Sequence, residues 1–354
     1  MKKRITRREF MTMSTTAVLG AGLSLKAGCR WSSGISGNGR VFEVINPAAV
    51  SEGRKVDPDT VRRMLHQGMV RLTGQKNPWA RFFSPNDRIG LKINTLGRPL
   101  LYTHHELIQA VVDELTEFGI PPNNIIVWDR WEHHMLACGF VLNTSADGVC
   151  CYGAHNPRDK AVFRWDSDVV YVSDFDDPED RGEEGTSSPF SSIFTRECDK
   201  IINMPILKDH SNSGITFCLK NMAYGFSSNN GRFHKPAFIS TFISDFCAHP
   251  LVREKVVLHI GDGLEGCFDR GPDPDSPRVL FTPNTLYLGA DPVAMDAVAR
   301  SVIDDARVTR GLTPVAETPG YYEGMRPSDH IEMAAQKGVG ICDPGRMNVE
   351  KILL

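Results

Sequence analysis

The chain has 354 residues, of which 41% are hydrophobic and 23% are charged, and its formal net charge at pH 7 is -3. This is the composition of an ordinary globular protein with one large core or two small ones. Without a basic excess or a basic amphipathic helix, nucleic acid and a membrane surface are not expected as partners.

The N-terminal segment predicts export. Residues 1–29 begin with a basic stretch containing the run RREFM at residues 7–11, and a mildly apolar stretch follows from Met13 to Leu25. This arrangement is typical of a twin-arginine signal, so we expect the twin-arginine translocase as a partner during export. The apolar stretch is shorter than the roughly 20 residues that span a bilayer.

The signal has two alternative processing sites. Ala27-Gly28-Cys29 matches the end of a lipoprotein box, although Lys26 stands where an aliphatic residue is usual, and ordinary cleavage near Ala27 is the alternative to lipidation. Residues 30–40 are expected as a tether rich in Ser and Gly. Both alternatives predict a periplasmic or cell-envelope protein that contacts the membrane only through its signal or a lipid anchor.

The cysteines do not indicate a metal cluster. None of the eight cysteines that follow Cys29 forms a Cys-x-x-Cys pair, which argues against an iron-sulfur cluster or a zinc ribbon. Most lie in apolar segments, where a free cysteine packs as a small hydrophobe. One or two disulfides are the alternative in an oxidising compartment.

The first half of the chain predicts alternating strands and helices. Asp57-Pro58 begins a helix, and Gly119 ends the next one. The expected strands are 41–46, 88–94 and 124–129, and the expected helices are 57–72 and 104–118. A strand, a helix and a strand in succession imply a parallel pair with a right-handed crossover.

The second half continues this pattern. Further strands are expected at 149–153, 169–173, 200–207, 256–260 and 285–289, and helices at 291–304 and 328–338. Residues 174–188 and 268–278 are expected as long loops. The sequence therefore predicts an α/β fold with a mainly parallel twisted sheet flanked by helices, and residues 41–354 as one large domain.

Residues 199–225 form the most informative stretch. An apolar run ends in Lys208-Asp209-His210, a small-residue loop follows, and a second apolar run ends in Lys220-Asn221. Other expected strands also end in polar residues: Lys92 and Asn94, Asp129 and Arg130, and Asp262. In open parallel sheets the ligand crevice lies beyond the carboxyl ends of the strands, so we expect one shared crevice. For each residue alone, a solvated strand end is the alternative.

These residue types suit a site for an anionic group. Lysines 92, 208 and 220 could hold a carboxylate or phosphate, and His210 could act as a general acid or base or as a metal ligand. The catalytic candidates are Lys208, His210 and Lys220, and the ligand-binding candidates are Lys92, Asn94, Asp129, Thr216, Asn221 and Asp262. The two aspartates would neutralise the lysines or bind a cation, and a divalent metal is one candidate cofactor.

Two other patterns in the sequence do not predict a binding site. Residues 261–266 match Gly-x-Gly-x-x-Gly, but the Pro-rich sequence that follows cannot form the helix that a dinucleotide site needs. His133 and His134 are expected on the surface, with the rim of the crevice as the alternative.

Several blocks in one order resemble the family called domain of unknown function 362. They are IGLKIN, HHELIQAVVDEL with IIVWD, INMPILKDH with GITFCLKNMAYG, IGDGLEG, and LGADPVAMDAVA, over about residues 85–305. The resemblance implies an α/β fold and a site around residues 208–221, but no substrate. Some relatives carry a ferredoxin-like cluster domain, whose closely spaced cysteines this chain lacks.

The sequence is compatible with two functions. One is an exported enzyme that acts on a small anionic substrate. The other is a non-catalytic binding or accessory protein for an envelope redox complex.

Overall fold

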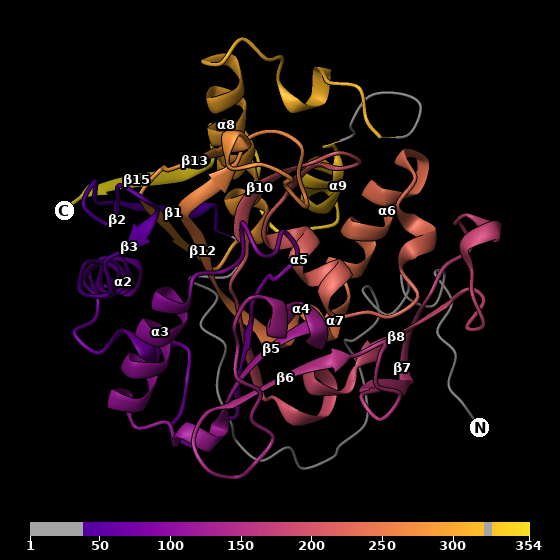
Figure 1. Ribbon diagram of the computed structural model, residues 1–354, viewed down its shortest axis with the longest axis horizontal. Coiled ribbons are helices and arrows are strands. Elements are labelled where there is room, and N and C mark those ends of the chain that lie inside the picture. Colours follow the sequence, from indigo (N-terminus) through magenta and orange to yellow (C-terminus); the bar gives the residue numbers. More distant parts are fainter. Residues whose placement is uncertain (1–37, 322–327) are drawn as a thin grey trace, which may run out of the picture.

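A single sheet with helices on both faces forms the centre of the molecule, as the computed structural model shows for residues 38–321 and 328–354 (Figure 1). The predicted α/β fold in one large domain is confirmed. The expected signal, with Cys29, lies outside the described residues.

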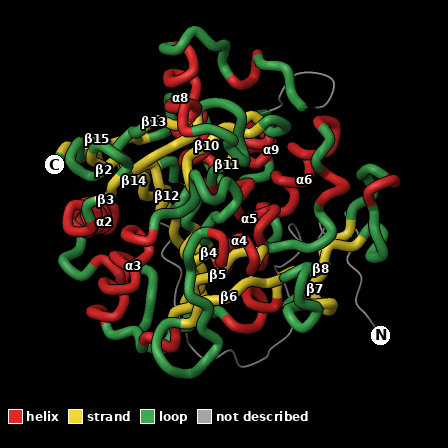
Figure 2. Tube along the Cα trace, viewed as in Figure 1, coloured by secondary structure: helices red, strands yellow, loops and turns green. Residues whose placement is uncertain are grey.

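The sheet has eleven strands and is mostly parallel. Its strands run through the middle of the molecule between the helices (Figure 2). From β12 to β6 all neighbours on the main path run parallel, and β14 alone on that path runs antiparallel to both of its neighbours. The order along this path is β15 (Asn348–Leu353), β1 (Arg40–Ile45), β14 (Thr285–Gly289), β12 (Val256–Cys267), β9 (Lys200–Asn203), β4 (Ile89–Lys92), β5 (Ile125–Trp131) and β6 (Cys150–His155). The predicted parallel pair of β4 and β5 is confirmed.

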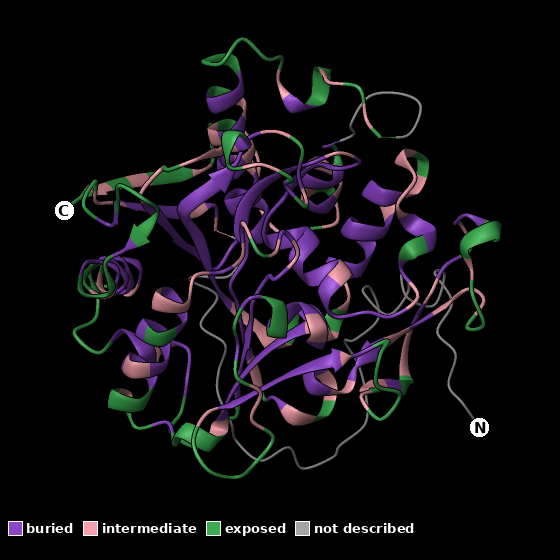
Figure 3. Ribbon diagram, in the orientation of Figure 1, coloured by how far each residue is buried: buried purple, intermediate pink, exposed green. Residues whose placement is uncertain are grey.

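Helices cover the two faces of the sheet, because successive side chains of a buried strand point to opposite faces. On one face lie α2 (Pro58–Thr73) and α3 (His105–Phe118), and on the other lie α5 (Cys218–Gly225), α6 (Pro236–Cys247), α8 (Pro292–Val308) and α9 (His330–Gln336). Each face has its own hydrophobic cluster, and the ribbon is buried where helices meet the sheet (Figure 3). The shorter elements are α4 (Glu132–Ala137), α7 (Pro250–Lys255), β2 (Val50–Ser51), β3 (Lys55–Val56) and β13 (Leu280–Phe281).

Capping residues set the helix boundaries that the sequence predicts. The Asp57 side chain accepts a hydrogen bond from the Thr60 amide, and Pro58 occupies the first turn of α2. Gly119 ends α3 in the left-handed conformation, with φ of 109°.

The stretch expected as a strand at 200–207 is two strands. The chain breaks after β9 at Met204-Pro205 and resumes as β10 (Ile206–His210), which pairs with β12 and with β11 (Gly214–Thr216). Lys208 and His210 therefore lie inside a strand, not after one. The second apolar run is β11 followed by helix α5, so Lys220 lies on a helix.

The strand expected at 169–173 is not part of the main sheet, whereas the prediction for residues 261–266 is confirmed. The strand expected at 169–173 belongs to β7 (Trp165–Val172), which pairs with β8 (Ser187–Ser191) in a separate two-stranded sheet. The glycine-rich run 261–266 continues β12, which confirms that no helix follows it. A Cβ at Gly261 would lie 2.2 Å from the Phe217 ring, so close packing explains that glycine.

Candidate functional site

A cavity of about 320 Å³ opens where β4 and β5 end. Its walls come from the ends of these strands, from α5, and from the segment 230–234. This is the position at which open parallel sheets bind ligands.

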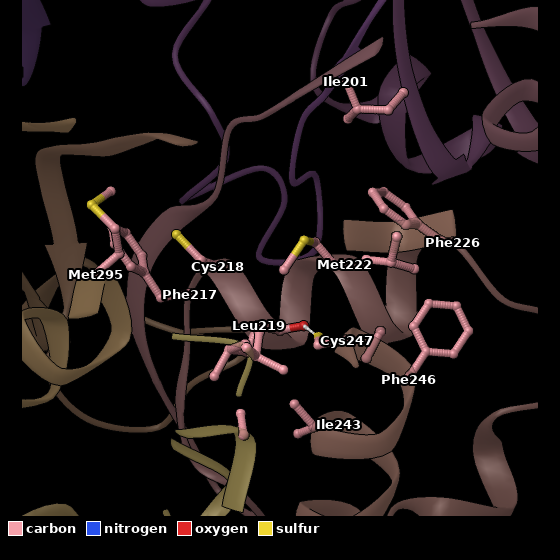
Figure 4. Packing of buried hydrophobic residues seen from close by; sticks show 14 of the residues in the cluster. Ile201, Phe217, Cys218, Leu219, Met222, Phe226, Ile243, Phe246, Cys247 and Met295 are labelled. Atoms are coloured by element: carbon pink, nitrogen blue, oxygen red, sulfur yellow. Dashed lines mark hydrogen bonds between the residues drawn. The ribbon is translucent and has the colours of Figure 1, made fainter. Parts of the chain in front are cut away.

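Helix α5 has one side in the core and one side at the cavity. Cys218, Leu219, Met222 and Phe226 pack with other apolar side chains in the core beneath the sheet (Figure 4). Lys220, Asn221 and Tyr224 instead line the cavity. Residues four apart share a helix face, which places Lys220 over the Tyr224 ring, 3.7 Å from its centroid.

A buried ion pair forms part of the cavity wall. Lys92 Nζ lies 2.8 Å from Asp129 Oδ1 and also donates to the Ile93 carbonyl at 2.7 Å and to Asn221 Oδ1 at 3.1 Å. The second Asp129 oxygen accepts from the amide and hydroxyl of Thr95, at 2.8 and 2.6 Å. Burial works to raise the pKa of Asp129, but the Lys92 ammonium and these hydrogen bonds outweigh it and lower that pKa. All three donors of Lys92 are thus in use.

A chain of amides connects this pair to a second lysine. Lys208 Nζ donates to Asn94 Oδ1 at 2.9 Å and to the Leu96 carbonyl, and Asn94 Nδ2 donates to Asn221 Oδ1 at 3.0 Å. Asn221 in turn donates to Asn203 Oδ1 at 2.8 Å. Burial lowers the pKa of Lys208 to about 8. The network holds β4, β9, β10 and α5 in one arrangement around the cavity.

Lys220 differs from the other two lysines. Its side chain is 4% exposed, and no hydrogen-bond acceptor or carboxylate contacts its amino group within the described parts of the chain. Burial lowers its pKa well below the ordinary value, and the positive charges of Lys208 and Arg130 lower it further. An amino group whose one described contact is the face of the Tyr224 ring therefore borders an open cavity.

Other cavity residues also have unused hydrogen-bonding atoms. Thr216 Oγ1, Arg130 Nε and His134 Nδ1 have no partner among the described residues. Burial lowers the pKa of Arg130 only to about 10, so its guanidinium stays charged at neutral pH. It lies 4.5 Å from the Trp131 ring centroid, a cation–π contact at the same wall.

Two histidines at the cavity are neutral. Burial, followed by the charge of Arg98, lowers the pKa of His134 to about 4. Burial, followed by the charge of Lys220, lowers the pKa of His234 to about 3. Because His234 Nδ1 lies 3.2 Å from the Gly231 carbonyl oxygen, an acceptor, Nδ1 carries the proton and Nε2 the lone pair.

Most of the residues singled out in the sequence come together here. Six of them line the cavity: Lys92, Asn94, Asp129, Thr216, Lys220 and Asn221. Lys208 reaches the same network through Asn94. His234 was not among the predicted residues. The prediction that His134 lies on the surface is wrong, because that side chain is buried and lines the cavity, as the alternative had it.

Two predicted site residues occupy other positions. His210 Nδ1 accepts hydrogen bonds from the amides of Asn212 and Ser213, at 3.0 and 3.3 Å, so its ring stabilises the turn after β10. Its ring centroid lies 6.5 Å from that of His234, next to the cavity wall.

Asp262 does not neutralise the lysines as predicted. It binds His104, with 2.8 Å between Asp262 Oδ2 and His104 Nδ1, and Glu265 contacts the other ring nitrogen at 3.3 Å. Burial works to lower the pKa of His104, but these carboxylates outweigh it and raise the pKa to about 10.

Metal-binding side chains are not gathered at the cavity. Across residues 38–321 and 328–354, no three His, Cys, Asp or Glu side chains form a group that could hold a metal ion. The eight cysteines in those ranges are free thiols, and seven of them are buried. No helix in those ranges has the length and apolar character needed to cross a bilayer.

Comparison with known proteins gives a family but no activity. A family model described as "Domain of unknown function (DUF362)" matches residues 89–301, which is more than half of the chain and contains the cavity-lining parts of β4, β5 and α5. No curated protein matches the chain.

Proposed function

We propose that this chain, which belongs to the DUF362 family, is an exported protein that binds a small anionic ligand in the cavity beside Lys220. The observation that carries the proposal is the amino group of Lys220, which is buried at the cavity wall over the Tyr224 ring and has no hydrogen-bond acceptor or carboxylate among the described residues. A buried amine that can ionise is costly to keep without a partner, so its position is best explained by a ligand that brings the opposite charge.

The charge balance of the cavity supports an anion. Asp129 is the only carboxylate that lines the cavity in the described parts of the chain, and Lys92 already neutralises it. The Arg130 cation and the ionisable amine of Lys220 then remain without a carboxylate partner in the cavity among the described residues. A carboxylate or phosphate has the acceptor oxygens that these groups, together with the Thr216 hydroxyl, can satisfy.

Isothermal titration calorimetry with three probes tests the proposal. Inorganic phosphate, glycolate and benzoate are each titrated into the wild-type protein and into Lys220→Met, which keeps the length of the side chain but removes its amine. We expect at least one probe to bind the wild type and to bind Lys220→Met about tenfold or more weakly, because a hydrogen bond to a charged group contributes about 1.5–3 kcal/mol.

The matched control is Lys351→Met, which removes an amine from a side chain that is 67% exposed and lies outside the cavity. Its affinity for the same probe should equal that of the wild type. Failure of all three probes to bind the wild type, or unchanged affinity in Lys220→Met, would refute an anion site at Lys220.

The export part of the proposal is supported by the residues of the N-terminal segment. The arginine pair Arg7-Arg8 before a short apolar stretch is typical of the twin-arginine route. Cell fractionation of the full chain should find it in the periplasm or envelope. The double variant Arg7→Lys, Arg8→Lys should stay in the cytoplasm, and export of that variant at the wild-type level would contradict this route.

A further inference from the structure

The three cavity lysines differ in how their amino groups are hydrogen-bonded. Lys92 uses all three of its donors, including one to a carboxylate. Lys208 is fully buried and donates to a side-chain amide and a backbone carbonyl. Within the described residues, Lys220 donates to no carboxylate, side-chain amide or backbone carbonyl, and it borders the cavity. Of these three amines, Lys220 alone can approach a ligand without first breaking a hydrogen bond.

The surroundings of Lys220 favour its neutral form. Its side chain is buried, and Lys208 and Arg130 add positive charge nearby; these effects oppose the contact with the Tyr224 ring, which favours the charged form. Burial and these charges lower its pKa, so its nitrogen carries a free lone pair in more of the molecules than that of an exposed lysine. A desolvated lysine beside other cations is one of the ways in which proteins make an amine nucleophilic.

We propose that Lys220 is a nucleophile that forms an imine with a small oxo acid, an anion with a carbonyl group next to its carboxylate. The proposal rests on the proposed function, because the anionic group of the ligand would hold its carbonyl carbon at Lys220. The Arg130 guanidinium and the Thr216 hydroxyl are donors for that anionic group in the same cavity.

The covalent step balances without a further reagent. The lone pair of Lys220 Nζ attacks the carbonyl carbon, the C=O π pair moves to oxygen, and a proton moves from nitrogen to that oxygen. The nitrogen pair then forms C=N while the C–O bond breaks, and the hydroxyl leaves as water after it takes up one proton from the solvent. His234 Nε2, which carries a lone pair at the same cavity, is a suitable carrier for the transferred proton. The product is an iminium beside the carboxylate of the ligand.

Reductive alkylation of the wild-type protein tests this inference. Formaldehyde with cyanoborohydride converts imines of lysine into stable methylamines, and peptide mass spectrometry gives the rate at each lysine. At pH 7 we expect Lys220 to react at least about tenfold faster than Lys351, because each unit by which a pKa falls increases the neutral fraction about tenfold. Lys351 is the internal reference, since its side chain is 67% exposed.

Two further experiments test the nucleophile and the anion site independently. Glyoxylate in place of formaldehyde should increase the ratio of Lys220 to Lys351, because it brings its own carboxylate, and glycolate should slow methylation of Lys220 only. Methylation of Lys220 no faster than that of Lys351 overturns the imine, whatever calorimetry shows for anions. Fast methylation that glycolate does not slow, or a ratio that glyoxylate does not increase, overturns the oxo-acid assignment. Failure of the proposed function itself would be seen separately, as absence of heat from phosphate, glycolate and benzoate.

Discussion

Replacing Asp129 by asparagine should destabilise the protein strongly. The substitution keeps the shape of the side chain but leaves the Lys92 ammonium, which is 1% exposed, without its counter-charge. Breaking a buried ion pair by removing one partner costs about 3–5 kcal/mol. The free energy of unfolding from urea titration should therefore fall by about that amount at pH 7.

The double variant Lys92→Met, Asp129→Asn tests the reason for this loss. It removes the buried charge as well, so it should regain at least about half of the lost stability, since apolar replacement of a whole pair is often close to neutral. The surface variant Glu117→Gln removes the partner of Arg62 from an exposed pair and should cost no more than about 1 kcal/mol. A loss below about 1 kcal/mol in Asp129→Asn, or a double variant less stable than the single one, would refute the reasoning.

The pH dependence has a fixed sign. The pKa of Asp129 is lower in the folded protein than its ordinary value of 3.8, so the folded state binds this proton more weakly than the unfolded state. Its stabilising contribution is present above pH 3.8 and is lost as the pH falls through the folded pKa. The difference between wild type and Asp129→Asn should thus become smaller in acid, and a difference that grows below pH 4 would contradict the assignment.

Three further predictions concern the cavity and its supports. Anion binding should weaken as the pH rises and should be accompanied by proton uptake, because a bound anion raises the lowered pKa of Lys220. Calorimetry in buffers of different ionisation enthalpy measures this uptake. Release of protons on binding would contradict the prediction. Gly225→Ala should destabilise by about 1–3 kcal/mol, since its Cβ would lie 2.5 Å from Lys92 Nζ, whereas Gly231→Ala, with nothing within 4 Å, should cost less in the same urea titration. Below pH 6.5, His104→Gln should be less stable than the wild type in urea titrations, because only the protonated His104 ring gains stability from its carboxylate partners. This loss should disappear as the pH rises through about 10, the pKa of His104 in the folded protein. A loss that persists above pH 10 would argue against the ion pairs.

The parts of the fold that local chemistry determines could be predicted. The Asp57 cap and the left-handed Gly119 mark helix ends by interactions within a few residues. The residues 200–225 were harder, because short apolar runs suit strands and helices equally. The break at Pro205 and the helix that carries Lys220 follow from pairing with β12 and from packing against distant helices.

The candidate site was predictable to the extent that parallel strands place their ends together. Lys92, Asn94 and Asp129 lie at the cavity for that reason. His234 comes from a segment without strand or helix periodicity, and the fold alone places it there. Asp262 is on β12, which β9 separates from β4, and it pairs with His104, a choice of partner that spacing along the chain does not reveal.

The pairing of β1 has a consequence for synthesis and quality control. All six residues of β1 pair with β15, which lies about three hundred residues later and includes Leu353. During translation β1 must wait for both of its neighbours, so this part of the sheet assembles late. A product that stops before Asn348 would leave one edge of β1 unpaired, and such an edge invites aggregation. Premature termination near the C-terminus should therefore be far more harmful than the few missing residues suggest.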